Sequence, residues 1–273
     1  MISPTRVGGE GAAAVAAAPR RPRLPLAIPI AIGVAWILTI AAQLSGWSIL
    51  VHHDTLIEGG AIPLWLATIV FLVAWQSMVV AMMLPSSLPM IRLFAATSAQ
   101  QRRPGEAMFA FLGGYAVVWT LFALVAFLGD VVLHKTVDHT PWLAAHPFLI
   151  GGSVLALAGL FQFSGLKEKC LSECRHPGAF LVPRYRRGSA AAFRIGREHG
   201  LFCLGCCWAL MLLVFALGVM DMWWMAGLTA VMVYEKVGKH GKQATPYIGV
   251  ALLVLAAAVF LQYPSFVPHI LAH

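Results

Sequence analysis

Long apolar runs separated by short polar segments dominate the chain. A helix that crosses the hydrocarbon core of a bilayer needs roughly 20 consecutive apolar residues. Runs of this kind predict seven spans, at about 24–47, 61–91, 107–129, 147–166, 201–217, 219–234 and 246–267. The sixth run is the weakest, because it is short and carries Asp221 near its start. The pattern predicts an all-α, polytopic transmembrane bundle in which residues 24–273 form a single domain.

The first 23 residues differ from the rest, being rich in Ala, Gly and Arg. We expect residues 1–23 to be a disordered, basic cytoplasmic tail. A cleaved signal peptide is the alternative, but the apolar run from Leu24 to Trp47 is longer than the hydrophobic region of a typical signal peptide. This run is therefore interpreted as the first span.

The distribution of basic residues predicts an orientation. Cytoplasmic segments of membrane proteins are enriched in Lys and Arg. With seven spans and a cytoplasmic N-terminus, 18 of the 19 Lys and Arg residues fall in four inner segments, 1–23, 92–106, 167–200 and 235–245. Omitting the weak span would place Lys236, Lys239 and Lys242 outside. We therefore expect seven spans, with the N-terminus cytoplasmic and the C-terminus outside.

Composition supports a membrane location and bears on partners. The chain is 60% hydrophobic and only 11% charged, whereas ordinary soluble domains carry about 25% charged residues. Lipid is therefore expected to cover much of the surface. The net charge of +8 is also typical of nucleic-acid-binding proteins. Because the basic residues lie between the spans, however, we interpret them as topology signals and expect no nucleic-acid partner.

The most informative stretch is HGLFCLGCCWALM, which starts at His199. On a helix, His199, Cys203, Cys207 and Met211 recur every four residues, and Cys206 lies one turn from Cys203. Thiolate and thioether are soft ligands that prefer Cu(I), while Cys and imidazole also suit Zn(II). The alternative is that these residues only pack, since Cys and Met also serve as adaptable core residues.

A second stretch supplies methionines. Met78 and Met82 share a helix face, Met83 follows, and Pro85 and Pro89 come directly after. The prolines remove backbone donors and predict a break or kink. Broken helices inside a membrane are tolerated where they line a site packed by protein or filled with water. The three methionines are therefore candidate thioether ligands, although such stripes also occur in ordinary cores.

The remaining cysteines, Cys170 and Cys174, lie in the segment 167–200, which we expect to be a cytoplasmic loop. With Cys203 and Cys206 they could close a tetrahedral zinc site, pass Cu(I) onward, or stay reduced thiols. The odd cysteine count and the inner position argue against a disulfide set.

Other ionisable side chains fit positions at span ends or in loops and need not be functional, although the outer histidines could alternatively collect a metal from outside. Asp221 lies at the outer end of its predicted span, and Glu235 and Lys236 are interpreted as an interfacial pair. Seven histidines are expected in solvated outer loops, namely His52, His53, His134, His139, His146, His269 and His273.

Several stretches together resemble a bacterial family of metal-binding integral membrane proteins, long classed as a domain of unknown function. The resemblance covers roughly residues 60–240. It is carried by Trp75 with Met78 and Ala81-Met82-Met83-Leu84-Pro85-Ser86; Leu166-Lys167 with Cys170-Leu171 and Cys174-Arg175-His176-Pro177; His199-Gly200 with Cys203, Gly205-Cys206-Cys207-Trp208 and Leu210-Met211; and Gly218 with Met220, Trp224-Met225 and Glu235-Lys236.

The resemblance implies a copper-handling protein of the bacterial inner membrane, because members of that family are described as copper chaperones, some associated with bacterial tyrosinases. A copper enzyme is then the expected client. One departure is Asp221, which stands where the family pattern has Asn.

Three functions from different classes follow. The first is a non-enzymatic Cu(I) chaperone or transporter-like protein that uses Cys203, Cys206, Cys207, Met82 and Met83. No nucleotide-binding loop is present in the sequence to drive transport. The second is a membrane thiol oxidoreductase that uses Cys203 and Cys206. The third is a scaffold with a structural zinc ion. The oligomeric state and the direction of metal movement are left open.

Overall fold

The computed structural model describes residues 4–17, 24–46, 63–217 and 222–261, and every structural statement refers to these residues. They contain helices and no strand, as the apolar pattern predicts. The helices are α1 (Pro4–Ala16), α2 (Ala27–Leu44), α5 (Leu64–Ser98), α6 (Pro104–Asp138), α7 (Pro141–Ala144), α8 (Phe148–Phe161), α9 (Gly165–Arg175), α10 (Pro177–Arg184), α11 (Ser189–Leu217), α12 (Met222–Val237) and α13 (Gly241–Leu261).

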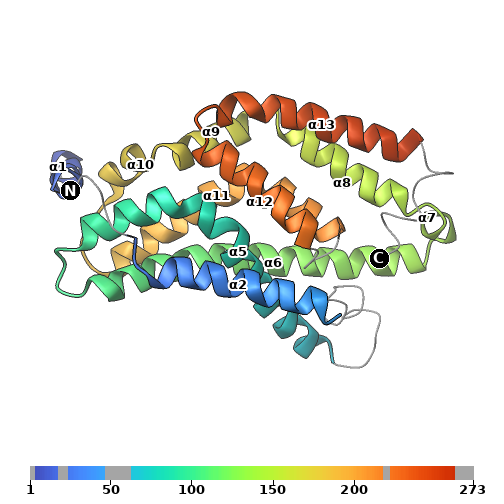
Figure 1. The fold of residues 1–273 in the computed structure, drawn as a ribbon, viewed down its shortest axis with the longest axis horizontal. Helices are drawn as coiled ribbons and strands as arrows, with labels where there is room; N and C mark the ends of the chain where they lie inside the picture. Colours follow the sequence, from blue (N-terminus) through green and yellow to red (C-terminus); the bar gives the residue numbers. More distant parts are fainter. Residues whose placement is uncertain (1–3, 18–23, 47–62, 218–221, 262–273) are drawn as a thin grey trace.

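The long helices run back and forth along the length of the molecule. The connections from α5 to α6 and from α10 to α11 lie at one end, and α7 lies at the other (Figure 1). Helix α11 packs along α6, α13 packs along α8, and α12 contacts α5, α9, α11 and α13. Helix α12 is thereby placed to bring side chains from its last turns into the middle of the bundle.

Five described helices are long and apolar enough to cross a membrane, namely α2, α5, α6, α11 and α13. Helices α8 and α9 reach this length only as a pair, bent by 65° at the short break between them. Helix α12, with 16 residues, is shorter than a full span. The described residues thus contain five or six candidate spans, and the count of seven and its orientation stay predictions.

Helix boundaries differ from the sequence prediction. The segment predicted as the loop 167–200 is mostly helical, since it contains α9, α10 and the first turns of α11. Hydropathy detects only the apolar part of a helix, so it misses turns with polar exposed faces. Likewise, α1 occupies much of the tail that was predicted to be disordered. Its alanines are strong helix formers, which accounts for the difference.

The two prolines bend α5 without ending it. The helix is continuous from Leu64 to Ser98, but its ribbon changes direction partway along (Figure 1). Pro85 has no N–H to donate to the carbonyl of Ala81, four residues earlier. Instead, the indole N–H of Trp36 on α2 donates to that carbonyl over 3.1 Å. A neighbouring helix thus satisfies the backbone group that the proline frees, as membrane interiors require.

Glycines allow α6 and α11 to approach closely. A Cβ at Gly114 would clash with the carbonyl oxygen of Phe193, and one at Gly196 would clash with that of Phe111. Small residues are the usual means of close helix packing in membranes. This contact positions Tyr115 of α6 against the part of α11 that carries the cysteines.

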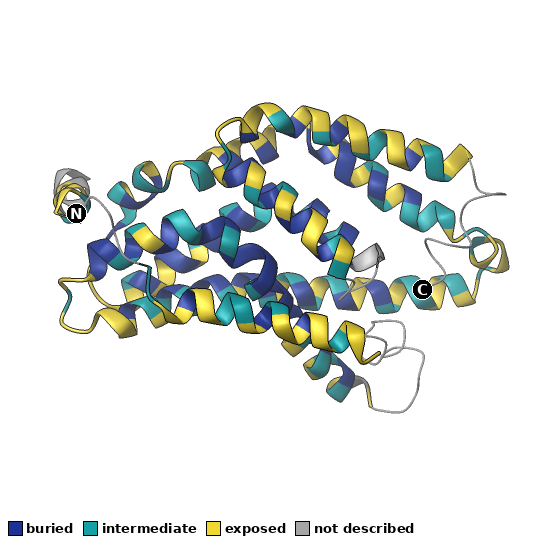
Figure 2. Ribbon diagram, viewed as in Figure 1, coloured by how far each residue is buried: buried dark blue, intermediate teal, exposed yellow. Residues whose placement is uncertain are grey.

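Burial separates the helices into an inner and an outer set. The middle of α5 and the length of α11 are mostly buried, whereas α2 and α13 expose long faces (Figure 2). These exposed faces carry large apolar side chains such as Ile37 and Val254, each more than half exposed. Such a surface fits the apolar environment of a lipid bilayer.

We predict that Gly114→Ala lowers the stability of the folded bundle by about 1–3 kcal/mol, because the added methyl group overpacks the contact between α6 and α11. The matched control is Gly113→Ala, where a Cβ meets nothing within 4 Å. Unfolding midpoints of both variants in detergent would test this. Equal midpoints for the two variants would contradict the close helix contact.

Candidate metal centre

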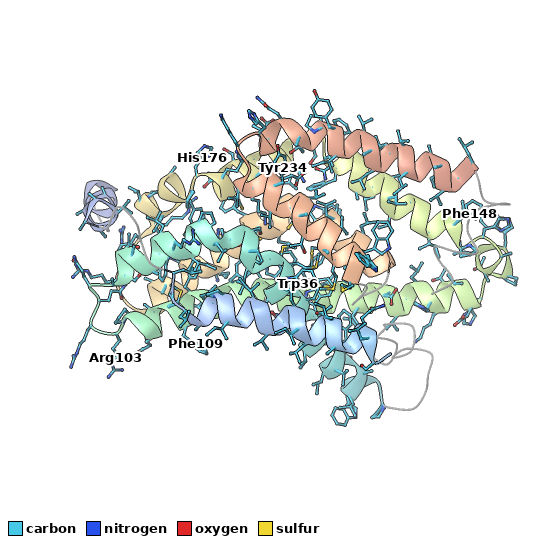
Figure 3. All side chains as sticks on the ribbon, viewed as in Figure 1. Trp36, Arg103, Phe109, Phe148, His176 and Tyr234 are labelled. Carbon is cyan, nitrogen blue, oxygen red and sulfur yellow. The ribbon has the colours of Figure 1, made fainter. Side chains whose placement is uncertain are left out.

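Three cysteines of α11 lie in the interior where α11 meets α5, α6 and α12. Cys203, Cys206 and Cys207 are each no more than 1% exposed. Sulfur atoms are gathered near the middle of the molecule, beside α12 (Figure 3). The helical spacing of these residues places Cys206 and Cys207 one turn from Cys203, on either side of it.

Two thiols and one thioether share a single buried space, and we call Cys203, Cys207 and Met83 the sulfur cluster. The Sγ of Cys207 lies 3.7 Å from the Sδ of Met83, which α5 carries just before its bend. The same Sγ donates to the carbonyl of Cys203 over 2.8 Å. The cluster thus joins two helices that are distant in sequence.

A lysine and a tyrosine complete the surroundings of Cys203. The Nζ of Lys236 lies 3.0 Å from the Sγ of Cys203, 3.1 Å from the Oγ of Ser86 and 4.0 Å from the Sγ of Cys207. The hydroxyl of Tyr115 lies 3.1 Å from the Sγ of Cys203. All of these side chains are buried. The sulfur cluster is therefore lined by hydrogen-bonding groups inside an otherwise apolar bundle.

Cys206 faces a different neighbour. Its thiol donates to the carbonyl of Cys203 over 3.1 Å, and Cys174 of α9 lies near it. Cys170 packs on Gly205, where an added Cβ would lie 2.5 Å from the Sγ. The thiols of α9 thus lie beside Cys206, and Cys174 is half-buried at the edge.

The described residues hold five free cysteines, and no group of three or more His, Cys, Asp or Glu side chains among them is arranged to hold a metal. The four thiols considered for a tetrahedral zinc site are therefore not arranged to hold a metal in the described structure. A site of two thiols and a methionine thioether is of a different kind, because thioethers are not among these side-chain types.

An ion pair lies buried between α9 and α12. The Nζ of Lys167 is 2.7 Å from Oε2 of Glu235, and both side chains are almost fully buried. Arg175 donates to the carbonyls of Glu235 and Gly238 at the end of α12. These contacts hold the last turns of α12, and with them Lys236, against α9 and α11.

Other predicted ligands lie in the core but outside the sulfur cluster. His199 is 3% exposed, stacks near Tyr115 and Phe111, and its Nε2 has no hydrogen-bond partner among the described residues. Met78, Met82 and Met211 are fully buried. None of the three hydrogen-bonds to a thiol in the part of the chain that the structure describes.

The described outer histidines do not gather. The Nδ1 atoms of His134, His139 and His146 each lie near a carbonyl one turn earlier in their own segment. His134 lies near the end of α6, and His139 follows directly as the residue that caps its C-terminus. Asp221, His52, His53, His269 and His273 lie outside the described residues.

Sequence reasoning missed the polar residues around the cluster. Lys236 and Glu235 were predicted to be an interfacial pair, but Glu235 pairs with Lys167 and Lys236 faces the cysteines. Charge counting treats every lysine near a span end as exposed and carries no information on burial. The contact of Ser86 with Lys236 could not be found from local sequence, because it joins positions 150 residues apart.

The geometry suits one kind of metal chemistry. Two thiols and a thioether form a soft, low-coordinate donor set, which favours Cu(I) over harder ions. The bundle around these groups is apolar, and Trp75 and Trp119 are among its fully buried side chains.

Comparison with known proteins also points to copper. The model of the PpoB2 family, whose description is copper chaperone, matches residues 72–259. No curated protein and no solved structure matches the chain. The matched region spans well over half of the chain and includes the sulfur cluster, Tyr115, Ser86 and Lys236. On this evidence, the chain belongs to the PpoB2 family of copper chaperones.

Proposed function

We propose that this protein is a membrane-embedded Cu(I) chaperone, which holds the ion at Cys203, Cys207 and Met83 and delivers it to a copper enzyme. The observation that carries the proposal is the buried contact between the Cys207 thiol and the Met83 thioether, beside Cys203. In this proposal the protein lies in the bacterial cytoplasmic membrane, and the sulfur cluster lies in the half of the bundle nearer the cytoplasm.

The number and type of donors favour Cu(I) over zinc in this proposal. Structural zinc sites are almost always four-coordinate, and the described residues offer no such set. Cu(I) accepts soft thiolate and thioether ligands, and the membership of a copper chaperone family agrees with that choice. The client is therefore expected to be a protein that requires copper.

Helix geometry supports metal holding over thiol oxidation. Cys203 and Cys206 lie one turn apart on α11, which is continuous from Ser189 to Leu217. Cβ atoms three residues apart on a helix are about 5–6 Å apart, whereas a disulfide requires about 3.5–4.5 Å. A disulfide between them would require the helix to distort, which favours metal binding over a thiol oxidoreductase that uses this pair.

The thiols on α9 offer a route for delivery. Cys206 lies on the same helix turn as the cluster and near Cys174, which is half-buried. Cu(I) would move by ligand exchange, in which one Cu–S bond forms as another breaks. The incoming thiol releases its proton to the sulfur that is left, and no electron is transferred.

The proposed orientation predicts opposite labelling of the two ends of α6. Arg102→Cys and Lys135→Cys, each introduced with Cys174→Ser, place exposed thiols just before α6 and near its end. A maleimide that cannot cross membranes should label position 102 only from the cytoplasmic side and position 135 only from the outside. The reverse pattern would contradict a cytoplasmic N-terminus.

Replacing both thiols of the sulfur cluster should abolish tight Cu(I) binding. We expect the reduced Cys203→Ser/Cys207→Ser protein to lose at least about 100-fold in Cu(I) affinity, or about 2.7 kcal/mol, because hydroxyls are poor ligands for soft ions. Competition with a chromophoric Cu(I) chelator measures this. Cys170→Ser, which changes a thiol that packs on Gly205, serves as the control, and equal affinities in all three proteins would refute the site.

The thioether should also contribute. Met83→Leu keeps the side-chain volume nearly unchanged but removes the sulfur, and we expect Cu(I) affinity to fall at least about tenfold, or about 1.4 kcal/mol. Met90→Leu is the matched control, because Met90 is equally buried on α5 but lies beyond the bend. The prediction fails if both variants bind Cu(I) as tightly as the unmodified protein.

A further inference from the structure

Lys236 is a buried cation whose closest partners are sulfur and hydroxyl groups. Its side chain is 5% exposed, and its Nζ contacts the Sγ of Cys203, the Oγ of Ser86 and the Sγ of Cys207. Buried charges in proteins are normally paired or bound to metals, because an isolated charge in a medium of low polarity is costly. The ammonium therefore requires negative charge nearby.

The buried carboxylates do not supply that charge. The buried acidic side chains among the described residues are Glu235 and Asp130. Glu235 forms its ion pair with Lys167, which neutralises both. Asp130 lies on α6 fifteen residues beyond Tyr115, which is about 22 Å along the helix axis. Compensation of Lys236 thus falls to the thiols that face it.

The charge of a bound metal ion decides whether the two thiolates, the ion and the ammonium of Lys236 together are neutral. Two thiolates and a monovalent ion carry a net charge of −1, which the ammonium of Lys236 cancels. Two thiolates and a divalent ion are already neutral, so the same ammonium would remain uncompensated. Leaving an unpaired charge buried is strongly unfavourable. The sulfur cluster with Lys236 is therefore electrostatically matched to a monovalent ion.

We propose that Lys236 determines the specificity of the sulfur cluster, by favouring Cu(I) and other monovalent soft ions over divalent ones. The inference rests on the proposed function, since it presumes that Cys203 and Cys207 bind the metal. It assigns to Lys236 a role that does not depend on touching the metal. A substitution of Lys236 changes the charge beside the metal but leaves the sulfur donors in place. Its effect on selectivity can therefore be attributed to charge and not to coordination number.

The test uses Ag(I) and Cd(II), two soft ions with the same number of electrons and different charge. The full-length protein, purified in detergent and reduced, is titrated with each ion in competition with a chelator of known affinity. In Lys236→Gln we expect the ratio of Ag(I) to Cd(II) affinity to fall at least about 100-fold, as for unit charges some 4 Å apart at an effective dielectric constant of about 20. Lys236→Arg keeps the charge and should retain the preference for Ag(I).

A second variant tests the same charge without altering the lysine. Ser86→Asp places a carboxylate where the hydroxyl meets Nζ, and it should lower the affinity ratio in the same direction as Lys236→Gln. The control is Lys242→Gln, because Lys242 is exposed and pairs with Glu168 away from the cluster. Its affinity ratio should match that of the unmodified protein.

The outcomes distinguish the two proposals. If the unmodified protein binds Ag(I) no better than the Cys203→Ser/Cys207→Ser protein, the proposed metal site itself is wrong. If it binds Ag(I) through those cysteines but the affinity ratio is unchanged in Lys236→Gln and Ser86→Asp, the role of Lys236 is refuted and the site stands. Should Lys236→Gln fail to fold, the ratio in Ser86→Asp decides.

Discussion

The contact between the Lys236 ammonium and the Cys203 thiol is the interaction on which the interior of this bundle depends. A cation placed 3.0 Å from sulfur and away from water is stable only if its surroundings supply charge and hydrogen bonds. The Oγ of Ser86 and the hydroxyl of Tyr115 provide hydrogen-bonding groups around this contact. Four helices must therefore be held in register, because each contributes one of these groups.

The rest of the fold supplies that register. The bend of α5 at Pro85 carries Met83 and Ser86 to the cluster, and Trp36 of α2 satisfies the carbonyl that the proline frees. Gly114 lets α6 approach α11 closely enough for Tyr115 to reach Cys203. The ion pair of Lys167 with Glu235 fixes the end of α12. Features that weaken an isolated helix, such as proline and glycine, here serve the packing of the bundle.

Hydropathy and spacing predicted the helical class and the proximity of Cys203 to Cys207, because these depend on local sequence. The copper chaperone family was predicted by the resemblance of several motifs to that family. Hydropathy and spacing also placed Met83 among the candidate thioether ligands, because it lies shortly before Pro85 on the same helix. They could not identify Tyr115, Ser86 or Lys236 as neighbours of the cysteines, because these contacts join distant helices. Lys236 was assigned to the membrane surface because counting charged residues along the sequence gives no information on which of them are buried. The number of spans stays a prediction, since α12 is short and the residues before it lie outside the described structure.

X-ray absorption at the copper edge of the reduced, Cu(I)-loaded protein would test the sulfur cluster as the copper site. We expect copper to be bound by two or three sulfur atoms and no nitrogen or oxygen ligand, with that signal lost when Cys203 and Cys207 are both replaced by serine. A copper ion coordinated mainly by nitrogen or oxygen, or a sulfur signal that persists without those two thiols, would contradict it.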